Sequence, residues 1–266
     1  MDTSELMSLA LAMAGMEAVP PDSAIYVHGE GIRRILAGID MGVPELMLAA
    51  DLGYDCVLAH HPQPAVLTYP DILDLHVAQM VRAGVPEGAA LAAVSNLKED
   101  AFYRYHSGNY DHAPSVARVL GMPYLNIHNP LDEIGRRLMA EAVSRVGPAE
   151  PVSAVVEALL ELEELRNAPT RPVVAVGSPA RRAGKVAVAH GAGTNGGYDV
   201  AKAYFAHGVD TLVYIHCDPG AVRRLRADGA GTLIIGGHIA CDRVGIVPYL
   251  RELERRGLEV TRVSGL

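Results

Sequence analysis

The chain has 266 residues, a formal net charge of −8 at pH 7, and a composition in which 50% of the residues are hydrophobic but only 5% are aromatic. This length allows a sizeable core without disulfide or metal support. A core of small aliphatic side chains is typical of parallel sheets covered by helices, which favours an α/β protein over a β-sandwich. The negative charge argues against non-specific binding to nucleic acid, which depends on clustered Lys and Arg.

Cysteine usage and the apolar segments indicate a cytoplasmic protein. The three cysteines, Cys56, Cys217 and Cys241, form no CxxC pair, and their odd number does not suit a disulfide framework. The chain begins MDTSELMSLALAMAG, where acidic residues stand in place of the positive charge of a signal peptide, so this segment is predicted to be an amphipathic helix. No apolar stretch approaches roughly 18 to 20 residues, so no membrane contact is expected.

Short β-like runs alternate with helical stretches along the chain, which predicts an α/β fold with mostly parallel sheets. The segment Val152–Arg166 has apolar residues at helical spacing between prolines, so it is predicted to be a helix that links two α/β halves, residues 1–150 and 151–266. The predicted strands are Ile25–Val27, Ile35–Ile39, Cys56–Ala59, Leu91–Val94, Tyr124–Ile127, Val173–Val176, Val186–Ala189, Thr211–Ile215 and Thr232–Ile235.

Two segments between these elements have compositions that suggest a place near a binding pocket. Residues 96–114 are polar and rich in tyrosine, and they are predicted to form a long loop or short helices, either over a binding pocket, at a subunit contact, or packed on the surface. The glycine-rich stretch Gly191–Gly197 follows a predicted strand and precedes a helix, where backbone amides can hold an anion. It lacks the P-loop pattern, so it is interpreted as a tight turn that borders the pocket or contacts a substrate phosphate.

The placement of the histidines is the most informative feature of the sequence. In open parallel sheets the carboxyl ends of the strands meet at one edge, where ligands bind, so histidines at several strand ends can share one pocket. Seven of the eleven histidines come directly after a β-like run: His28, His60, His61, His128, His190, His216 and His238.

Two of these histidines begin the same short motif, H-x-x-x-D. The pairs are His128 with Asp132 and His238 with Asp242, and in a helix residues four apart lie on one face and can bind the same ion. The adjacent His60 and His61 precede a proline, whose restricted backbone favours a sharp turn that directs one imidazole to each of two ions. Mixed imidazole and carboxylate ligands suit Zn, Fe, Mn or Ni.

Read in order, four motifs resemble the Nif-three-like family, whose members are often labelled GTP cyclohydrolase I type 2 homologues. The resemblance extends from near Ile32 to the C-terminus, and it implies that two metal ions are held by His60, His61, His128, Asp132, His238 and Asp242. The motifs are AHHP (Ala59–Pro62), IHNPLD (Ile127–Asp132), KVAVAHGAG (Lys185–Gly193) and GGHIACD (Gly236–Asp242).

The chain departs from the family pattern in two places. Asn129 stands where Thr is usual, and Asp242 stands where Glu is usual, so a shorter carboxylate replaces one that can bridge two ions. The segment from His106 to Asp111 also loosely resembles the second motif, and His128 with Asp132 is preferred because this pair directly follows a strand.

The resemblance implies two similar α/β halves with the metal site between them, no inserted domain, and a homo-oligomer in the form of a ring-like hexamer. Two metals held in this way suit hydrolysis of a small-molecule substrate, with Asp132 bridging the ions and His190 and His216 in supporting or general acid–base roles. The alternative is a metal-binding protein without catalysis, acting as a metal store, a chaperone or a regulatory partner. Nothing in the sequence specifies guanine recognition.

Overall fold

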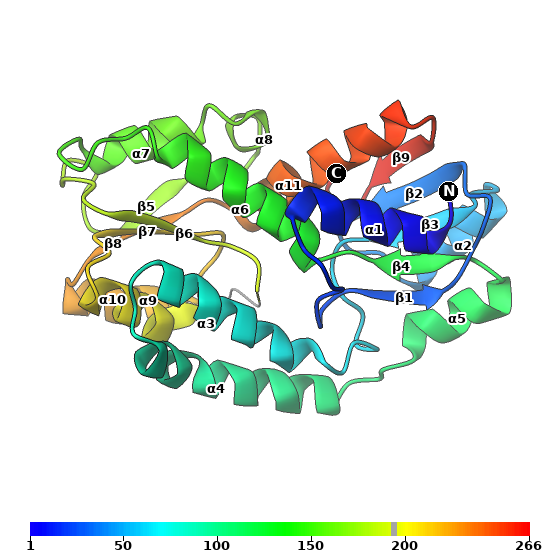
Figure 1. Cartoon of the computed structure of the whole chain (residues 1–266), viewed down its shortest axis with the longest axis horizontal. Coiled ribbons are helices and arrows are strands. Elements are labelled where there is room, and N and C mark those ends of the chain that lie inside the picture. Colours follow the sequence, from blue (N-terminus) through cyan, green and yellow to red (C-terminus); the bar gives the residue numbers. More distant parts are fainter. Residues whose placement is uncertain (193–195) are drawn as a thin grey trace. The chain divides into compact units, whose positions relative to one another are not determined.

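Two separate sheets organise the chain, and each belongs to its own structural unit. The computed structural model describes residues 1–192 and 196–266. Unit 1 comprises Met1–Pro70, Ala101–Ile134 and Gly245–Leu266, and unit 2 comprises Asp71–Asp100 and Gly135–Val244. Both sheets are mostly parallel and are covered by helices (Figure 1), which confirms the predicted α/β fold.

The sheet of unit 1 has the strand order β1-β4-β3-β2-β9. Strands β4, β3, β2 and β9 run parallel to one another, whereas β1 pairs antiparallel with β4 and has an irregularity between Ile25 and Val27. The strands are β1 (Ala24–Val27), β2 (Arg34–Gly38), β3 (Cys56–Ala59), β4 (Tyr124–Asn126) and β9 (Glu259–Val263).

Helices cover this sheet on both faces. Helices α2 (Val43–Asp51) and α5 (His112–Leu120) pack together against side chains that include Leu36, Val57 and Tyr124. On the other face, Leu58 lines a small cavity with Ile246 and Leu250 of α11 (His238–Arg255). The Tyr249 hydroxyl of α11 donates a hydrogen bond of 3.0 Å to the Leu6 carbonyl of α1 (Thr3–Ala14), which joins these two helices.

The sheet of unit 2 has the strand order β5-β8-β7-β6. Strands β6, β7 and β8 are parallel, whereas β5 pairs antiparallel with β8 and has an irregularity between Val174 and Val176. The strands are β5 (Val173–Val176), β6 (Val186–Ala189), β7 (Thr211–Tyr214) and β8 (Thr232–Ile235).

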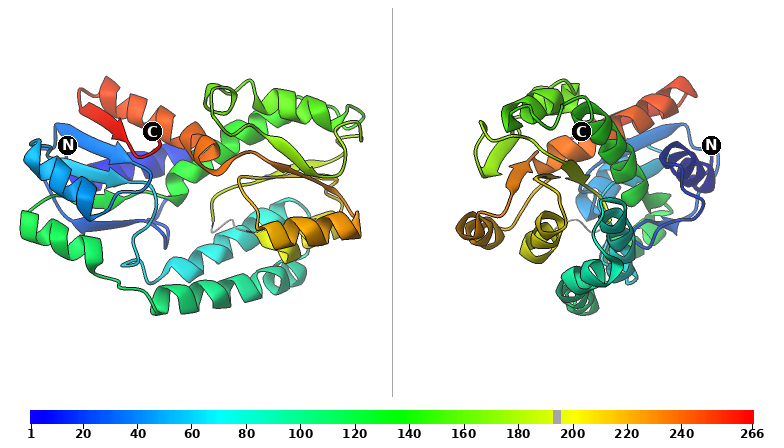
Figure 2. Two further views of the ribbon diagram at one scale, coloured as in Figure 1. Left: turned by 180° about the vertical axis from the view of Figure 1, so that it is seen from behind. Right: turned by 60° about the vertical axis from the view of Figure 1, so that its left-hand side comes forward.

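Both faces of the unit 2 sheet are buried, and side chains along its central strand alternate between two cores. Leu212 and Tyr214 face the core formed with α3, α4, α9 and α10, whereas Val213 and Ile215 face the core formed with α6, α7, α8 and α11. Helices α9 and α10 pack side by side (Figure 2). The remaining helices are α3 (Leu73–Arg82), α4 (Glu87–His106), α6 (Asn129–Val143), α7 (Val152–Leu159), α8 (Glu163–Arg166), α9 (Gly197–Ala206) and α10 (Pro219–Asp228), and a short 3-10 helix spans Tyr69–Ile72.

The two units repeat one topology. In each, the first strand lies antiparallel against the third of three consecutive parallel strands, so that β1 and β4 correspond to β5 and β8. Strands β4 and β8 are each followed by an H-x-x-x-D motif at which a helix begins, α6 directly after His128 and α11 at His238. His128 and His238 therefore occupy equivalent positions in the topologies of two similar halves.

Several predicted elements differ in the structure. The predicted strand Leu91–Val94 lies inside α4, because its Ala-rich surroundings favour a helix and a short apolar run does not distinguish the two states. The predicted helix Val152–Arg166 is divided into α7 and α8, both within unit 2. Much of 96–114 is helical, in the end of α4 and the start of α5. Strand β9 was not predicted, and it pairs with β2 at the sheet edge.

None of the helices in the described ranges combines the length and the apolar character that a membrane crossing requires.

Candidate metal centre

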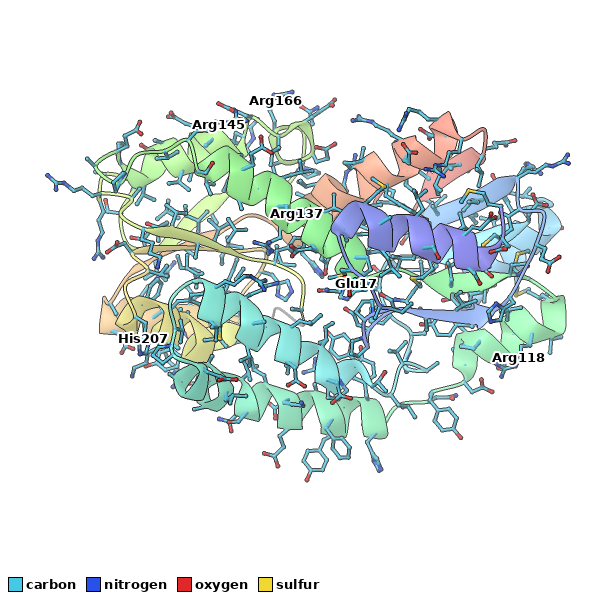
Figure 3. All side chains as sticks on the ribbon, viewed as in Figure 1. Glu17, Arg118, Arg137, Arg145, Arg166 and His207 are labelled. Carbon is cyan, nitrogen blue, oxygen red and sulfur yellow. The ribbon has the colours of Figure 1, made fainter. Side chains whose placement is uncertain are left out.

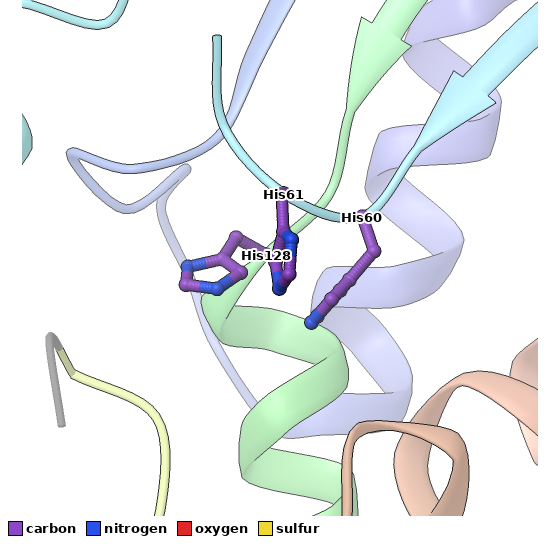
Figure 4. A group of neighbouring side chains, drawn as sticks. All are labelled: His60, His61 and His128. Atoms are coloured by element: carbon purple, nitrogen blue, oxygen red, sulfur yellow. The ribbon is translucent and has the colours of Figure 1, made fainter. Parts of the chain in front are cut away.

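Three histidines of unit 1 converge at the carboxyl edge of its sheet. His60 and His61 follow β3, and His128 follows the neighbouring parallel strand β4. Their ligand atoms all lie within 4.8 Å of one another. Figure 4 shows the three rings side by side, with His60 and His61 presented by one turn. The predicted meeting of these imidazoles at one sheet edge is therefore observed within unit 1.

Asp132 joins this cluster through the first turn of α6. The helix begins directly after His128, and Pro130 in its first turn is compatible with the missing backbone hydrogen bonds there. Asp132 Oδ1 lies 3.2 Å from His60 Nε2, and Asp132 Oδ2 lies 3.7 Å from His128 Nε2. The H-x-x-x-D spacing thus brings the carboxylate of Asp132 back over the imidazole of His128, as expected for residues four apart in a helix.

Each imidazole of the cluster has its Nδ1 atom engaged by an acceptor. His60 Nδ1 lies 3.0 Å from the Ile127 carbonyl oxygen, His61 Nδ1 lies 2.7 Å from Asp40 Oδ1, and His128 Nδ1 lies 2.7 Å from Asp22 Oδ2. An Nδ1–H that donates to an oxygen fixes the tautomer and leaves the Nε2 lone pair available as a ligand. This arrangement is the usual support of metal-binding histidines.

The contact between His60 and Asp132 is itself informative. The Ile127 carbonyl can only accept, so Nδ1 of His60 carries a proton and Nε2 of the neutral ring is an acceptor. Nε2 nevertheless lies 3.2 Å from a carboxylate oxygen, in a pair whose side chains are 1% and 3% exposed. Two acceptors at this distance require a positive centre between them, either a proton carried by the ring or the carboxyl group or a metal ion. The imidazole and carboxylate donors suit a transition-metal ion.

Asp22 and Asp40 were not predicted from the sequence, and their positions have a simple origin. Asp22 precedes β1, and because β1 is antiparallel, its amino end lies at the edge where the parallel strands have their carboxyl ends. Asp40 comes shortly after β2, so its position directly after a predicted strand could have identified it as a candidate site residue. The Asp22 side chain is fully buried, whereas that of Asp40 is 72% exposed.

The buried Asn126 at the end of β4 fixes the backbone around the cluster. Its Nδ2 donates to the Asp22 carbonyl at 2.8 Å and to the His60 carbonyl at 3.3 Å. Its Oδ1 accepts from the Tyr26 hydroxyl at 2.6 Å and from the Ala24 amide at 3.1 Å. One side chain thereby holds the segment before β1 against the turn that presents His60.

A second, smaller cluster lies in unit 2. His238 is the first residue of α11, and its Nε2 lies 3.4 Å from Oδ2 of Asp242, one turn later. The ring of His216, which comes after β7, has its centroid 4.5 Å from that of His238. Asp242 is buried, and His238 is partly exposed. This half of the chain therefore repeats the imidazole–carboxylate pairing of the H-x-x-x-D motif and adds a second imidazole.

The remaining strand-end histidines lie elsewhere. His190 follows β6 in unit 2 and is fully buried, and its carbonyl accepts a hydrogen bond of 3.1 Å from Gln79 Nε2 of α3. His28 follows the antiparallel β1 and is exposed, because the carboxyl end of that strand lies at the opposite sheet edge.

The alternative pair His106 and Asp111 has a different environment. His106 is the exposed last residue of α4 and packs against Phe102, and Asp111 forms an ion pair with Arg118. In the glycine-rich stretch Gly191–Gly197, residues 193–195 lie outside the described residues.

The chain is similar to several solved structures. A NIF3 superfamily protein from Sphaerobacter thermophilus is 49% identical, with a TM-score of 0.98, and the match covers 100% of this chain and 99% of that one. Reduced HcgD from Methanocaldococcus jannaschii matches with a TM-score of 0.60 at 13% identity, covering 98% and 97%. The protein TTHA1606 from Thermus thermophilus matches with a TM-score of 0.56 at 16% identity, covering 99% and 98%. These last two show likeness of fold alone. No protein-family model and no curated protein matches the chain.

Proposed function

Because the chain belongs to the NIF3 superfamily, we propose that it binds two metal ions and uses them to hydrolyse a small-molecule substrate. The observation that carries this proposal is the cluster of His60, His61 and His128, whose ligand atoms lie within 4.8 Å of one another while each Nδ1 is engaged by an oxygen. That donor set is prepared for a metal ion through Nε2.

We assign six ligands to the two ions. Catalytic metal sites commonly use about three protein ligands for each ion and keep a position for water. The unit 1 cluster supplies three imidazoles and one carboxylate, which is too few for two such ions. His238 and Asp242 supply the remaining donors in this proposal. Their assignment is supported by the equivalent positions of the two H-x-x-x-D motifs in the topologies of the two halves. The ligands are His60, His61, His128, Asp132, His238 and Asp242.

The chain's own residues have distinct roles in the proposed reaction. Bound divalent ions of Zn, Fe, Mn or Ni would supply Lewis acidity and lower the pKa of water. Asp132 would contribute to holding both ions, because its two oxygens face different imidazoles. His216, 4.5 Å from His238 between ring centroids, is proposed to move a proton during hydrolysis. His190, fully buried at the end of β6, is proposed to support the site or to act as a general acid or base.

The protein is further proposed to act in the cytoplasm as a ring-like hexamer. This proposal rests on the family resemblance and on the odd number of cysteines, and the three cysteines in the structure are free thiols. Light scattering of the purified protein tests it directly, because a hexamer of a 28.2 kDa chain differs sharply in mass from a monomer or dimer. A monomer at micromolar concentration would contradict the proposal.

The decisive experiment measures metal content and turnover on the same samples. Untagged wild-type protein is expected to contain about two transition-metal ions per chain by plasma mass spectrometry, and Asp132→Ala is expected to lose most of them. Asp51→Ala, which removes an exposed carboxylate of α2, is the matched control and is expected to keep them. Metal-loaded wild type is then screened against phosphoesters, amides and cyclic substrates.

The outcomes separate the parts of the proposal. Loss of metal together with loss of turnover in Asp132→Ala supports a metal-dependent hydrolase. Metal binding without turnover of any substrate overturns hydrolysis and leaves a metal store, chaperone or regulatory protein. Full metal content in Asp132→Ala overturns the assignment of the ligands.

A further inference from the structure

A pocket of unit 1 opens beside the histidine cluster. It has a volume of about 200 Å³ and is lined by Pro62, Pro64, Arg104 and Tyr105. Pro62 directly follows His61 in the chain, and the ring of Tyr105 contacts that of Tyr69, which in turn lies near the ring of His128. The volume is below the roughly 300–1,000 Å³ of pockets for drug-sized ligands. A ligand of this pocket is therefore small.

One wall of the pocket is the aromatic ring of Tyr105, which stacks on a second aromatic ring. The ring of Tyr105 stacks on that of Tyr69, with centroids 4.5 Å apart and an interplanar angle of 12°. The Tyr69 ring in turn has its centroid 6.5 Å from that of His128. Burial raises the pKa of Tyr105 to about 12, and burial also raises that of Tyr69. Both hydroxyls are therefore neutral near pH 7.

The positive charge of the pocket comes from Arg104. Its guanidinium makes no hydrogen bond or ion pair with any residue in the described part of the chain. Arg118, on α5 in the same unit (Figure 3), shows the contrast. Its guanidinium forms an ion pair with Asp111. An unpaired guanidinium presents a planar fork of donors that matches phosphate or carboxylate oxygens.

We propose that this pocket binds the substrate by its non-reacting end, and that the substrate is a small molecule that carries a single planar ring and an anionic group, phosphate or carboxylate. Arg104 binds the anionic group. The ring lies against Tyr105 and the two prolines, whose flat apolar surfaces suit an aromatic face. The proposal rests on the proposed function only where it calls the ligand a substrate, because binding to the pocket needs no metal.

The pocket also explains how such a substrate would be positioned. Two ring contacts, from Tyr105 to Tyr69 and from Tyr69 to His128, connect the pocket to the histidine cluster. A ring that rests on Tyr105 is held at a fixed place relative to the histidine cluster, and a reactive bond a few atoms away would face that cluster. Binding energy from the non-reacting end then orients the reacting bond.

Equilibrium binding of phenylphosphonate tests the proposal, because this compound has a ring and an anion but no hydrolysable ester. Titration calorimetry compares the wild type with Arg104→Gln and Tyr105→Leu, and Arg118→Gln is the matched control for loss of an arginine in the same unit. We expect binding at least about tenfold weaker in the two pocket variants and unchanged in the control, in line with loss of a charge-assisted or stacking contact. Inorganic phosphate alone is expected to bind more weakly than phenylphosphonate.

The same titrations in an Asp132→Ala background exclude direct binding of the phosphonate to metal. Wild-type affinity in Arg104→Gln overturns the role of Arg104, and equal binding of inorganic phosphate overturns the role of the ring. Metal content, measured on each sample, separates this proposal from the proposed function. Normal metal with binding that ignores Arg104 contradicts only the pocket, and absent metal with Arg104-dependent binding contradicts only the metal centre.

Discussion

The carboxylate of Asp22 and the imidazole of His128 lie 2.7 Å apart, although 106 residues separate them in the sequence. Asp22 is fully buried, and its other carboxylate oxygen accepts a hydrogen bond of 3.3 Å from the Ser23 hydroxyl. A buried carboxylate that accepts from Nδ1 orients the ring and makes Nε2 a stronger ligand. Asp22 therefore acts as a positioning residue for His128.

Replacing Asp22 with Asn is expected to weaken metal binding about 10- to 100-fold, the usual effect of losing such a partner. The amide can still accept from Nδ1–H, but it lacks the charge that strengthens His128 as a ligand. Competition with a chromophoric chelator measures the affinity. Asp111→Asn, which removes an exposed carboxylate that pairs with Arg118, is the control. Unchanged affinity in Asp22→Asn would rule out this role.

Asp40→Asn is expected to weaken metal binding less than Asp22→Asn does. Both carboxylates accept from an Nδ1 atom at 2.7 Å, but the Asp40 side chain is 72% exposed and that of Asp22 is 0% exposed. Water screens the charge of Asp40, so its influence on His61 is smaller. The same chelator competition ranks the two variants, and a larger loss for Asp40→Asn would show that burial does not decide the effect.

Asn126→Ala is expected to destabilise the protein by about 2–4 kcal/mol, because it removes four hydrogen bonds of a buried side chain and leaves buried groups unpaired. Urea denaturation measures the free energy of unfolding. Asn96→Ala, at an exposed position of α4, is the control and is expected to change it by less than about 0.5 kcal/mol. A similar small change for Asn126→Ala would contradict the role of this side chain as a structural anchor.

His76 of α3 is expected to make the protein less stable in acid. Burial lowers the pKa of His76 from 6.5 to about 4 in the folded chain. Between these pH values the unfolded chain binds the proton and the folded chain does not. The free energy of unfolding therefore decreases as the pH falls below 6.5, and the decrease due to His76 is about 3 kcal/mol near pH 4. Urea denaturation of His76→Leu at pH 7, 5.5 and 4.5 should show a shallower fall than wild type, whereas the exposed control His28→Gln should follow wild type. Parallel curves for His76→Leu would exclude this contribution.

Local spacing was enough to predict the central part of the candidate site. His60 and His61 were predicted to end a strand, and they follow β3. Asp132 was predicted to lie over His128, and the first turn of α6 places it there. Both predictions concern residues at most four apart, whose relation is determined by the backbone geometry of a strand end or a helical turn. The same reasoning succeeded for His238 and Asp242 in α11.

Only the tertiary structure decided which distant residues contact these side chains. Asp22 reaches His128 because β1 pairs antiparallel with β4. Arg104 and Tyr105 line the pocket with Pro62 because α4 continues through a segment predicted to be a long loop or short helices. The direction of an edge strand depends on which partner buries its side chains best, and that choice involves contacts far apart in the chain. The sequence therefore determined the local geometry of the candidate ligands, whereas long-range packing determined the carboxylates that contact them and the pocket.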